Sequence, residues 1–515
     1  MKRLYILPVL ALLLSGCVDD EGNYDYAELN EVKLENMESS YSAISQIDRV
    51  KISPKISSTF YGDDLSNFEF KWTICTDMIH HNHILISTEK DLDWLAEIEP
   101  GSYYLYFTIK DKTTGFEDQY YTGLGISSPF TTGFLVLGDL VGENRSALDM
   151  IAMPAGRDTM MVEDAFDGKQ VNLTGAQKVI FAGQHYSGAD GHKQALWLLT
   201  DNQSYRLGSG SVFDFRGEFN DLGIIEVDYP VAKPAKMVDM FPHQTISYNM
   251  PYNASQTYRG YLTEDVVVMA QVMMAEYYAE PANRYSKTSA TLFKPAPYIF
   301  YKGADKSAYN TCVVYDMDDD CFARVEPMSG YSTKLSDKDT DPWKFDAKSE
   351  GRKLFYGENT FNNVSYAIMT DAEGNYFIYG FTPPTSAYGN ASKQQLVTVD
   401  KSIATDFDKA SHYMFAATRT AIFYSVGSRL YQYDWARKMI SHIDFDAEIT
   451  MIKPEFISTN SNYLYLVATY SDQNKGMIYK MERSDDPNTL VFNHVENQQW
   501  PTRLKVKDIE WKNAN

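Results

Sequence analysis

The chain is poor in cysteine and in positive charge. Its 515 residues include only four cysteines, too few for a scaffold held by disulfide bonds. Lysine and arginine number 47 against 69 aspartates and glutamates, so the formal net charge is −22. Because a nucleic-acid-binding surface needs an excess of lysine and arginine to meet the phosphates, this balance argues against DNA or RNA as a partner.

The sequence also lacks the short motifs of common enzyme classes. It contains no His-Glu-x-x-His, no Gly-x-Ser-x-Gly and no phosphate-binding Gly-x-x-x-x-Gly-Lys-Ser/Thr. Carboxylates are too numerous for one pair to be chosen as a glycosidase dyad, because such a dyad is defined by separation in space. We therefore predict no catalytic residue and no cofactor. An enzyme whose site is assembled from distant segments stays open as an alternative.

Tyrosine, in contrast, is abundant. There are 38 tyrosines, and aromatic residues reach 14% of the chain, together with 30 glycines and 19 prolines. This composition favours β-strands joined by turns. The length exceeds that of one ordinary hydrophobic core, so we expect more than one domain.

The N-terminus has the pattern of a lipoprotein signal peptide. Lys2 and Arg3 precede an apolar run over residues 4–14, which as a helix would rise about 16 Å, roughly half of a bilayer core. The run therefore predicts a cleaved signal peptide over residues 1–16 rather than a membrane span. It ends in Leu-Ser-Gly-Cys, which resembles a bacterial lipobox and predicts a lipid anchor on Cys17.

An acidic cluster follows the predicted anchor within a linker over residues 17–30. Asp19, Asp20 and Glu21 resemble the export signal of diderm bacteria that display lipoproteins on the outer face of the outer membrane. The alternative is a solvated linker, which acidic residues also suit. We predict a protein anchored in the outer membrane that faces the extracellular side.

Residues 31–128 predict a small β-sandwich. Alternating apolar and polar residues over 32–34, 50–52 and 68–72 have the two-residue period of strands, and a further strand over 102–109 follows the turn at Pro100-Gly101. About seven strands, one with a central Trp72, fit an immunoglobulin-like fold.

Several local motifs resemble the PKD-like family of surface lipoproteins, which are found beside outer-membrane importers of the SusC/SusD type. The resemblance rests on residues 22–26, Trp72, residues 87–92, residues 100–104 and residues 132–137. It implies a surface location and a TonB-dependent SusC/SusD-type importer as partner. It carries over no catalytic residue.

Residues 129–515 predict a β-propeller of seven or eight blades. Strand–turn–strand units recur over residues 366–379, 422–433 and 463–481, at spacings close to the length of one four-stranded blade. The strand at residues 134–137 is expected to close the ring against the C-terminal strands. A second and third β-sandwich are the alternative.

A tyrosine-rich stretch within residues 241–301 is the candidate ligand-binding segment. Tyr248, Tyr252, Tyr258 and Arg259 are predicted to line the binding surface, because proline and asparagine interrupt this part of the strand pattern. The alternative is that these rings pack in the core of the propeller.

A cysteine pair and a histidine cluster are two further candidate sites. Cys312 and Cys321 bracket a segment that can fold into a hairpin, which predicts a disulfide bond in an exported protein. His80, His81 and His83 could share a metal ion, but no further ligand stands at an identifiable spacing, so we predict a polar loop and no metal site.

The whole pattern favours a non-catalytic accessory subunit that binds a peptide or glycan nutrient for the importer. The alternatives are a surface hydrolase of the same nutrient and a purely structural importer subunit.

Overall fold

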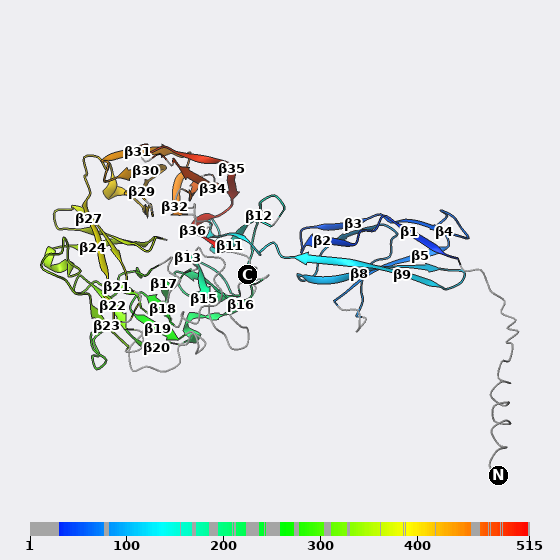
Figure 1. The fold of residues 1–515 in the computed structure, drawn as a ribbon, viewed down its shortest axis with the longest axis horizontal. Helices are drawn as coiled ribbons and strands as arrows, with labels where there is room; N and C mark the ends of the chain where they lie inside the picture. Colours follow the sequence, from blue (N-terminus) through cyan, green and yellow to red (C-terminus); the bar gives the residue numbers. More distant parts are fainter. Residues whose placement is uncertain are drawn as a thin grey trace, which may run out of the picture. The chain divides into compact units, whose positions relative to one another are not determined.

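The chain divides between Ser127 and Ser128 into two compact units (Figure 1). The computed structural model describes residues 30–512 with internal gaps at 77–81, 155, 167–170, 185–193, 209, 211–212, 223–235, 242, 244–257, 272–277, 303–310, 327–329, 361, 385, 387, 418, 455–463, 472, 474, 485 and 487. No helix within these residues is long and apolar enough to cross a membrane.

The N-terminal unit is a β-sandwich. Its larger sheet has the order β2-β9-β8-β5-β6, and the pairs β1-β4 and β3-β7 complete it. Trp72 lies at the centre of the core, wholly buried, with its ring stacked on Phe107 at 4.2 Å and its indole N–H donating to the carbonyl of Glu89. The strands are β1 (Val32–Glu35), β2 (Ser40–Ile44), β3 (Arg49–Ile52), β4 (Lys55–Ser58), β5 (Phe68–Cys75), β6 (Ile84–Ser87), β7 (Leu92–Leu95), β8 (Gly101–Asp111) and β9 (Glu117–Ser127).

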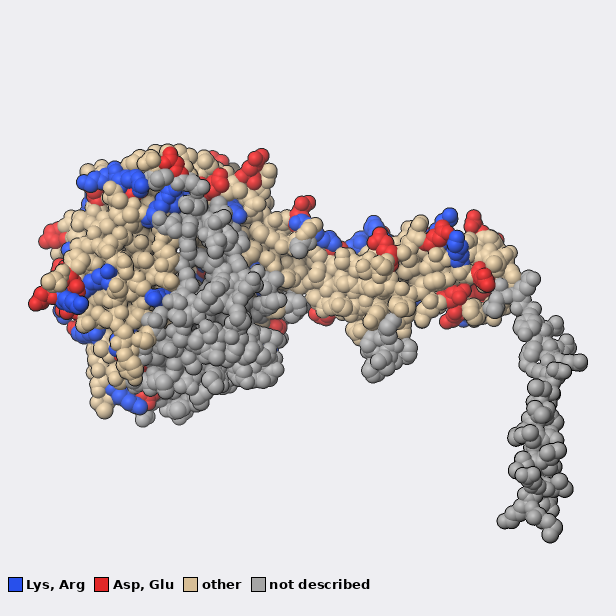
Figure 2. Space-filling model, viewed as in Figure 1, with Lys and Arg blue, Asp and Glu red and all other residues tan. Residues whose placement is uncertain are grey.

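Charged side chains of both signs are interspersed on the visible face of the sandwich (Figure 2). Some form exposed ion pairs across neighbouring strands, such as Lys51 with Asp93 at 3.3 Å and Lys55 with Glu35 at 3.7 Å. Exposed pairs of this kind contribute little to stability, so the sandwich depends on its apolar core.

The C-terminal unit is a β-propeller in which the described residues form seven sheets. Figure 1 shows the sheets following one another in chain order around the unit, from cyan through green and yellow to red. We number the blades in that order and name each strand from the inside outward. Blade 1 is β36 (Lys505–Lys512), β10 (Gly133–Leu140), β11 (Arg145–Ala152) and β12 (Met160–Val162). Blade 2 is β13 (Ala176–Gln184), β14 (Gln194–Thr200), β15 (Ser204–Leu207) and β16 (Phe215–Glu218), and blade 3 is β17 (Met237–Phe241), β18 (Tyr258–Thr263), β19 (Val267–Gln271) and β20 (Tyr278–Pro281).

The remaining blades follow the same scheme. Blade 4 contains β21 (Val313–Asp316), β22 (Cys321–Glu326) and β23 (Tyr331–Lys334), and blade 5 contains β24 (Lys353–Asn359), β25 (Ser365–Thr370), β26 (Tyr376–Thr382) and β27 (Ser392–Thr398). Blade 6 contains β28 (His412–Phe415), β29 (Ala421–Val426), β30 (Arg429–Asp434) and β31 (Met439–Asp444), and blade 7 contains β32 (Glu448–Pro454), β33 (Leu464–Ser471), β34 (Lys475–Arg483) and β35 (Phe492–Thr502). The short 3-10 helices are η1 (Phe219–Leu222), η3 (Ala347–Glu350) and η4 (Phe407–Lys409).

Blade 4 gains its innermost strand from a segment outside the regular ladder. Residues 295–301 form isolated bridges to β21 through Pro295 with Asp316 and through Phe300 with Val313. The same segment reaches blade 5, because the Asn359 side chain donates to the carbonyl of Ile299 at 2.6 Å and accepts the Tyr301 amide at 3.0 Å.

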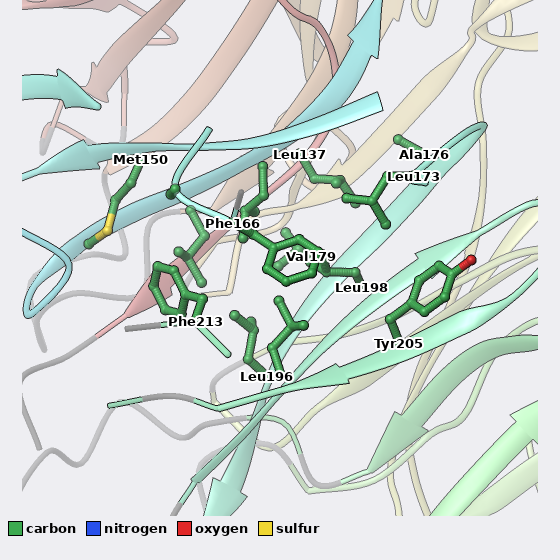
Figure 3. Close-up of a cluster of buried hydrophobic side chains, with 14 of the residues drawn as sticks. Leu137, Met150, Phe166, Leu173, Ala176, Val179, Leu196, Leu198, Tyr205 and Phe213 are labelled. Atoms are coloured by element: carbon green, nitrogen blue, oxygen red, sulfur yellow. The ribbon is translucent and has the colours of Figure 1, made fainter. Parts of the chain in front are cut away.

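Buried apolar clusters join each blade to the next. The cluster between blades 1 and 2 includes Leu137 and Met150 from one sheet and Val179, Leu196 and Leu198 from the other (Figure 3). Six more clusters continue around the ring, between blades 2 and 3, 3 and 4, 4 and 5, 5 and 6, 6 and 7, and finally 7 and 1. Every sheet is therefore buried on both faces, which explains its runs of consecutive apolar residues.

The ring is closed by pairing between the two ends of the unit. The C-terminal β36 pairs antiparallel with β10, with Phe134 opposite Trp511 and Val136 opposite Ile509. The predicted closure through residues 134–137 is thus confirmed. The seven blades formed by the described residues also agree with the predicted number of seven or eight. The recurring hairpins predicted from the sequence are β25–β26, β29–β30 and β33–β34, the two middle strands of blades 5, 6 and 7.

Candidate functional site

A pocket of about 600 Å³ lies where the inner strands of all seven blades converge. This volume is within the range of sites that enclose a small molecule. Its walls include Lys178 from β13, Asp239 and His243 from blade 3, Tyr298, Ile299 and Tyr301 from blade 4, Phe355–Thr360 from blade 5, Ala410–Met414 from blade 6, Met451–Pro454 from blade 7 and Lys507, Asp508 and Glu510 from β36.

One charged group in the pocket is centred on Asp239. This carboxylate is largely buried and lies 3.4 Å from the Lys178 ammonium and 3.0 Å from Nε2 of His243. Burial alone would raise the pKa of Asp239, but the Lys178 charge and the hydrogen bond with His243 outweigh it and lower the pKa to about 2. Asp239 is therefore ionised at every physiological pH.

A second charged group is centred on Lys453 of blade 7. Its ammonium lies 3.0 Å from Asp508 and 2.9 Å from Glu510, both on the closing strand β36. Burial disfavours the charged ammonium, yet the two carboxylates outweigh it and raise the pKa of Lys453. Asp508 also accepts the Val179 amide at 3.0 Å, so this group ties blade 7, the closing strand and blade 2 together.

The opposite side of the lining, from blades 4, 5 and 6, is aromatic. Tyr356 lies 5.6 Å from Tyr298 and 5.4 Å from Tyr413, measured between ring centroids, and Phe355 lies 5.7 Å from Tyr413. Phe355 is 39% exposed although it is a large apolar side chain. Rings that line a pocket and remain accessible offer flat apolar faces to a ligand.

Glu358 lies within this aromatic wall. Its Oε2 accepts the Phe415 amide at 2.8 Å. The Tyr356 hydroxyl lies 3.3 Å from this Oε2 and 2.8 Å from the Tyr413 carbonyl oxygen, and shares its single hydrogen between the two acceptors. Burial among the rings disfavours the carboxylate and raises the pKa of Glu358 to about 8, because these two hydrogen bonds only partly compensate. At neutral pH this side chain is therefore mostly un-ionised.

None of the four residues predicted from the sequence to bind ligand is among the described residues that line this pocket. Tyr248 and Tyr252 lie outside the described residues, and Tyr258 is the first residue of β18. Arg259, also in β18, is wholly buried, and it is not among the residues that line the pocket. The predicted stretch 241–301 does contribute His243, Tyr298, Ile299 and Tyr301.

The predicted disulfide bond is wrong, because Cys312 and Cys321 are both free and buried. The expected hairpin does form, but its register places Cys321 opposite Asp316. Cys312 precedes the first residue of β21, and its carbonyl accepts the amide of Val325 at the other end of the hairpin. The ladder thus separates the two thiols along its length.

The remaining candidates concern the anchor and the histidines. Cys17, Asp19, Asp20 and Glu21 lie outside the described residues, as do His80 and His81. His83 is described and shares a hydrogen bond with Thr73 at 2.9 Å. No group of three or more potential metal ligands occurs in the part of the chain that the structure describes.

The pocket itself was not predicted from the sequence. Its residues are spread from Lys178 to Glu510 and come from all seven blades, so no local spacing relates them. The available signal was a charged residue inside an otherwise apolar strand, as in Asp239 of Met-Val-Asp-Met-Phe. No such signal marks Asp508 and Glu510, because β36 also contains three lysines.

Comparisons with known proteins match one family model to the N-terminal part of the chain. A model of the PKD-like family matches residues 17–174, which confirms the resemblance over the sandwich and the first propeller strands. No curated protein matches the sequence. Among solved structures, a quinonprotein alcohol dehydrogenase-like protein of Bacteroides thetaiotaomicron is similar with 11% identity and a TM-score of 0.39, over 92% of this chain and 96% of that one.

Two other similar structures are matched over a smaller share of each chain. The extracellular domain of a protein described as a one-component system of B. thetaiotaomicron shares 10% identity over 79% of this chain and 53% of that one, with a TM-score of 0.34. The WD40 domain of SCAP from fission yeast shares 9% identity over 71% and 90%, with a TM-score of 0.32. The chain is thus similar to the PKD-like family in its first third, and its own seven sheets define the propeller that follows.

Proposed function

We propose that this protein is a surface lipoprotein that captures a small nutrient ligand, a glycan or a peptide, in the central pocket of its propeller. The observation that carries the proposal is the pocket of about 600 Å³, lined on one side by aromatic rings, of which Phe355 is exposed, and on the other by fixed charged groups. Apolar faces combined with a few fixed polar groups are typical of ligand sites.

The place of action follows from the N-terminal sequence. Lipidation of Cys17 would hold the protein at the outer membrane, and the acidic residues behind it would direct it to the outer face. The match to the PKD-like family begins at Cys17, which supports this assignment. A TonB-dependent importer of the SusC/SusD type is the proposed partner, to which the captured ligand would pass.

Ligand capture is tested with the Phe355→Ala variant. The ligand is first identified from a panel of oligosaccharides and peptides. Truncating this accessible ring should then weaken binding of that ligand by about tenfold, a loss typical of a contacting aromatic side chain. Met439→Ala is the matched control, because Met439 is also 39% exposed but lies on β31, the outermost strand of blade 6. Equal binding by the two variants would contradict the proposal.

A hydrolase is the second candidate, and one observation favours it. The pocket holds a mostly un-ionised Glu358 together with carboxylates that are paired with Lys453. An acid and an ionised base in one pocket could protonate a leaving oxygen and activate a water. Release of reducing ends from a bound oligosaccharide, lost in Glu358→Gln, would establish this activity; binding without product would exclude it for that ligand.

A further inference from the structure

Building on the proposed capture function, we propose that the pocket selects an uncharged, hydroxyl-rich ligand such as a neutral oligosaccharide, and that Glu358 enforces this selection by presenting its carboxyl group as a hydrogen-bond donor. Glu358 would thus be the specificity-determining residue of the site. The argument rests on how the charges of the pocket are paired and on where Glu358 lies.

Each ionised side chain that lines the pocket already has a partner of opposite charge. Lys178 pairs with Asp239, and Lys453 pairs with both Asp508 and Glu510. Lys507 lies 3.8 Å from Asp139 of β10. A ligand with a free charge would have to compete with one of these pairs and lose its own hydration as well. The charged groups can instead offer their remaining hydrogen-bonding capacity to neutral polar groups.

The two histidines among the described residues that line the pocket add no unpaired charge to it. His412 shares a hydrogen bond with the Ser425 hydroxyl at 3.0 Å, and burial lowers the pKa of His412, so the ring is neutral at pH 7. His243 lies against Asp239, and any charge on it is met there.

Glu358 is the exception, a carboxyl group with no cation beside it. The groups that face it are the Tyr356 hydroxyl on its own strand, the Phe415 amide on β28 and the Tyr366 ring opposite it on β25. No lysine or arginine of the described chain is among them. Both hydrogen-bond contacts of the carboxyl group within the described residues are made by Oε2, so a proton carried on Oε1 is free to be donated to a ligand.

A neutral carboxyl group between aromatic rings discriminates among ligands. It can donate to a hydroxyl or ether oxygen of a sugar whose apolar face stacks on Phe355 or Tyr356. A ligand carboxylate or phosphate that approached the same place would be left in an apolar wall without a countercharge. When Glu358 ionises, the donor disappears and a half-buried negative charge takes its place, so the affinity for a neutral sugar should fall at high pH.

The test measures affinity by calorimetry on the mature chain, residues 17–515, in detergent. The probes are neutral tetrasaccharides of glucose, mannose and xylose, an acidic tetragalacturonate, and tetrapeptides with free or blocked ends. We expect a neutral tetrasaccharide to bind, with an affinity about tenfold or more lower at pH 9.5 than at pH 7, because Glu358 titrates near pH 8.

Variants assign the pH dependence to Glu358. In Glu358→Gln the ratio of the affinities at the two pH values should fall to about one, since the amide cannot ionise. In Glu143→Gln, which alters an exposed glutamate outside the pocket lining, the ratio should stay as in the wild type. Melting curves at both pH values confirm that each variant is folded.

Three outcomes separate the possibilities. An affinity for the neutral sugar that does not change with pH, or that changes equally in Glu358→Gln, overturns the inference. Preferred binding of the charged tetrapeptide or of tetragalacturonate also overturns it while leaving ligand capture intact. Failure of every probe to bind overturns both the inference and the proposed function.

Discussion

Replacing Glu358 by glutamine should make the protein more stable, by an amount that grows with pH. The ordinary pKa of a glutamate, about 4.5, applies in the unfolded chain, whereas burial raises the pKa of Glu358 to about 8 in the folded protein. Between these values the unfolded chain has lost the proton and the folded protein still holds it. The contribution of Glu358 to the free energy of unfolding of the wild type therefore falls as the pH rises.

The size of the effect follows from the separation of the two pKa values. Below about pH 4.5 both states are protonated, and ionisation contributes nothing to the difference between wild type and Glu358→Gln. Each pH unit above that is worth about 1.4 kcal/mol. The variant should gain on the order of 3 kcal/mol relative to wild type at pH 7, and the gain should level off at about 5 kcal/mol above pH 8.

The assay is urea unfolding followed by tryptophan fluorescence at pH 5, 7 and 8.5. Five of the seven tryptophans lie in the propeller unit, so the signal reports mainly on that unit. Glu143→Gln serves as the control, with no pH-dependent difference expected from an exposed glutamate. A difference between Glu358→Gln and wild type that stays constant from pH 5 to pH 8.5, or that shrinks, would refute the reasoning about the aromatic wall.

Three further predictions concern the closure, the anchor and the predicted tyrosines. Lys453→Met leaves Asp508 and Glu510 on the closing strand β36 buried without their cation, so the free energy of unfolding in urea should fall by about 3 kcal/mol or more. Arg429→Met, which breaks an exposed ion pair, should cost far less, and equal losses would contradict a stabilising role of Lys453 in closing the ring. Cys17→Ala should release the protein from the outer-membrane fraction, and retention there would show that the lipobox assignment is wrong. If Tyr252 contacts ligand, Tyr252→Ala should weaken binding about tenfold with little change in melting temperature, whereas a large loss of stability with normal binding would make it a core residue.

The strands and their grouping into hairpins could be predicted from the sequence because they depend on neighbours along the chain. The alternation around Trp72 and the turn at Pro100-Gly101 are local patterns, and they correspond to β5 and β8 of the sandwich. The hairpins of blades 5 to 7 likewise carry both strands and their turn in one short stretch. The apolar residues at 134–137 also indicated a buried strand that needed a partner from elsewhere.

The register of paired strands and the burial of side chains between blades were decided only by the tertiary structure. Cys312 and Cys321 are close enough in sequence for a bridge, but the ladder pairs Cys321 with Asp316 and so keeps the thiols apart. Arg259 looked like a contact residue beside Tyr258, yet packing between blades buries it completely.

The central pocket was likewise decided by the tertiary structure and not by local sequence. Nothing near Glu358 in the sequence indicates an un-ionised carboxyl group, because its pKa is raised by burial in the folded propeller, which the hydrogen bond from the Phe415 amide of blade 6 offsets only in part. Asp508 and Lys453 are likewise 55 positions apart and meet only when the ring closes. The sequence by itself determined the strands and their hairpins, since these follow from local periodicity, and it indicated that the strand at residues 134–137 pairs with the C-terminal strands. The site was decided by the closure of seven blades around one axis, which brings distant side chains within hydrogen-bonding distance and removes them from water.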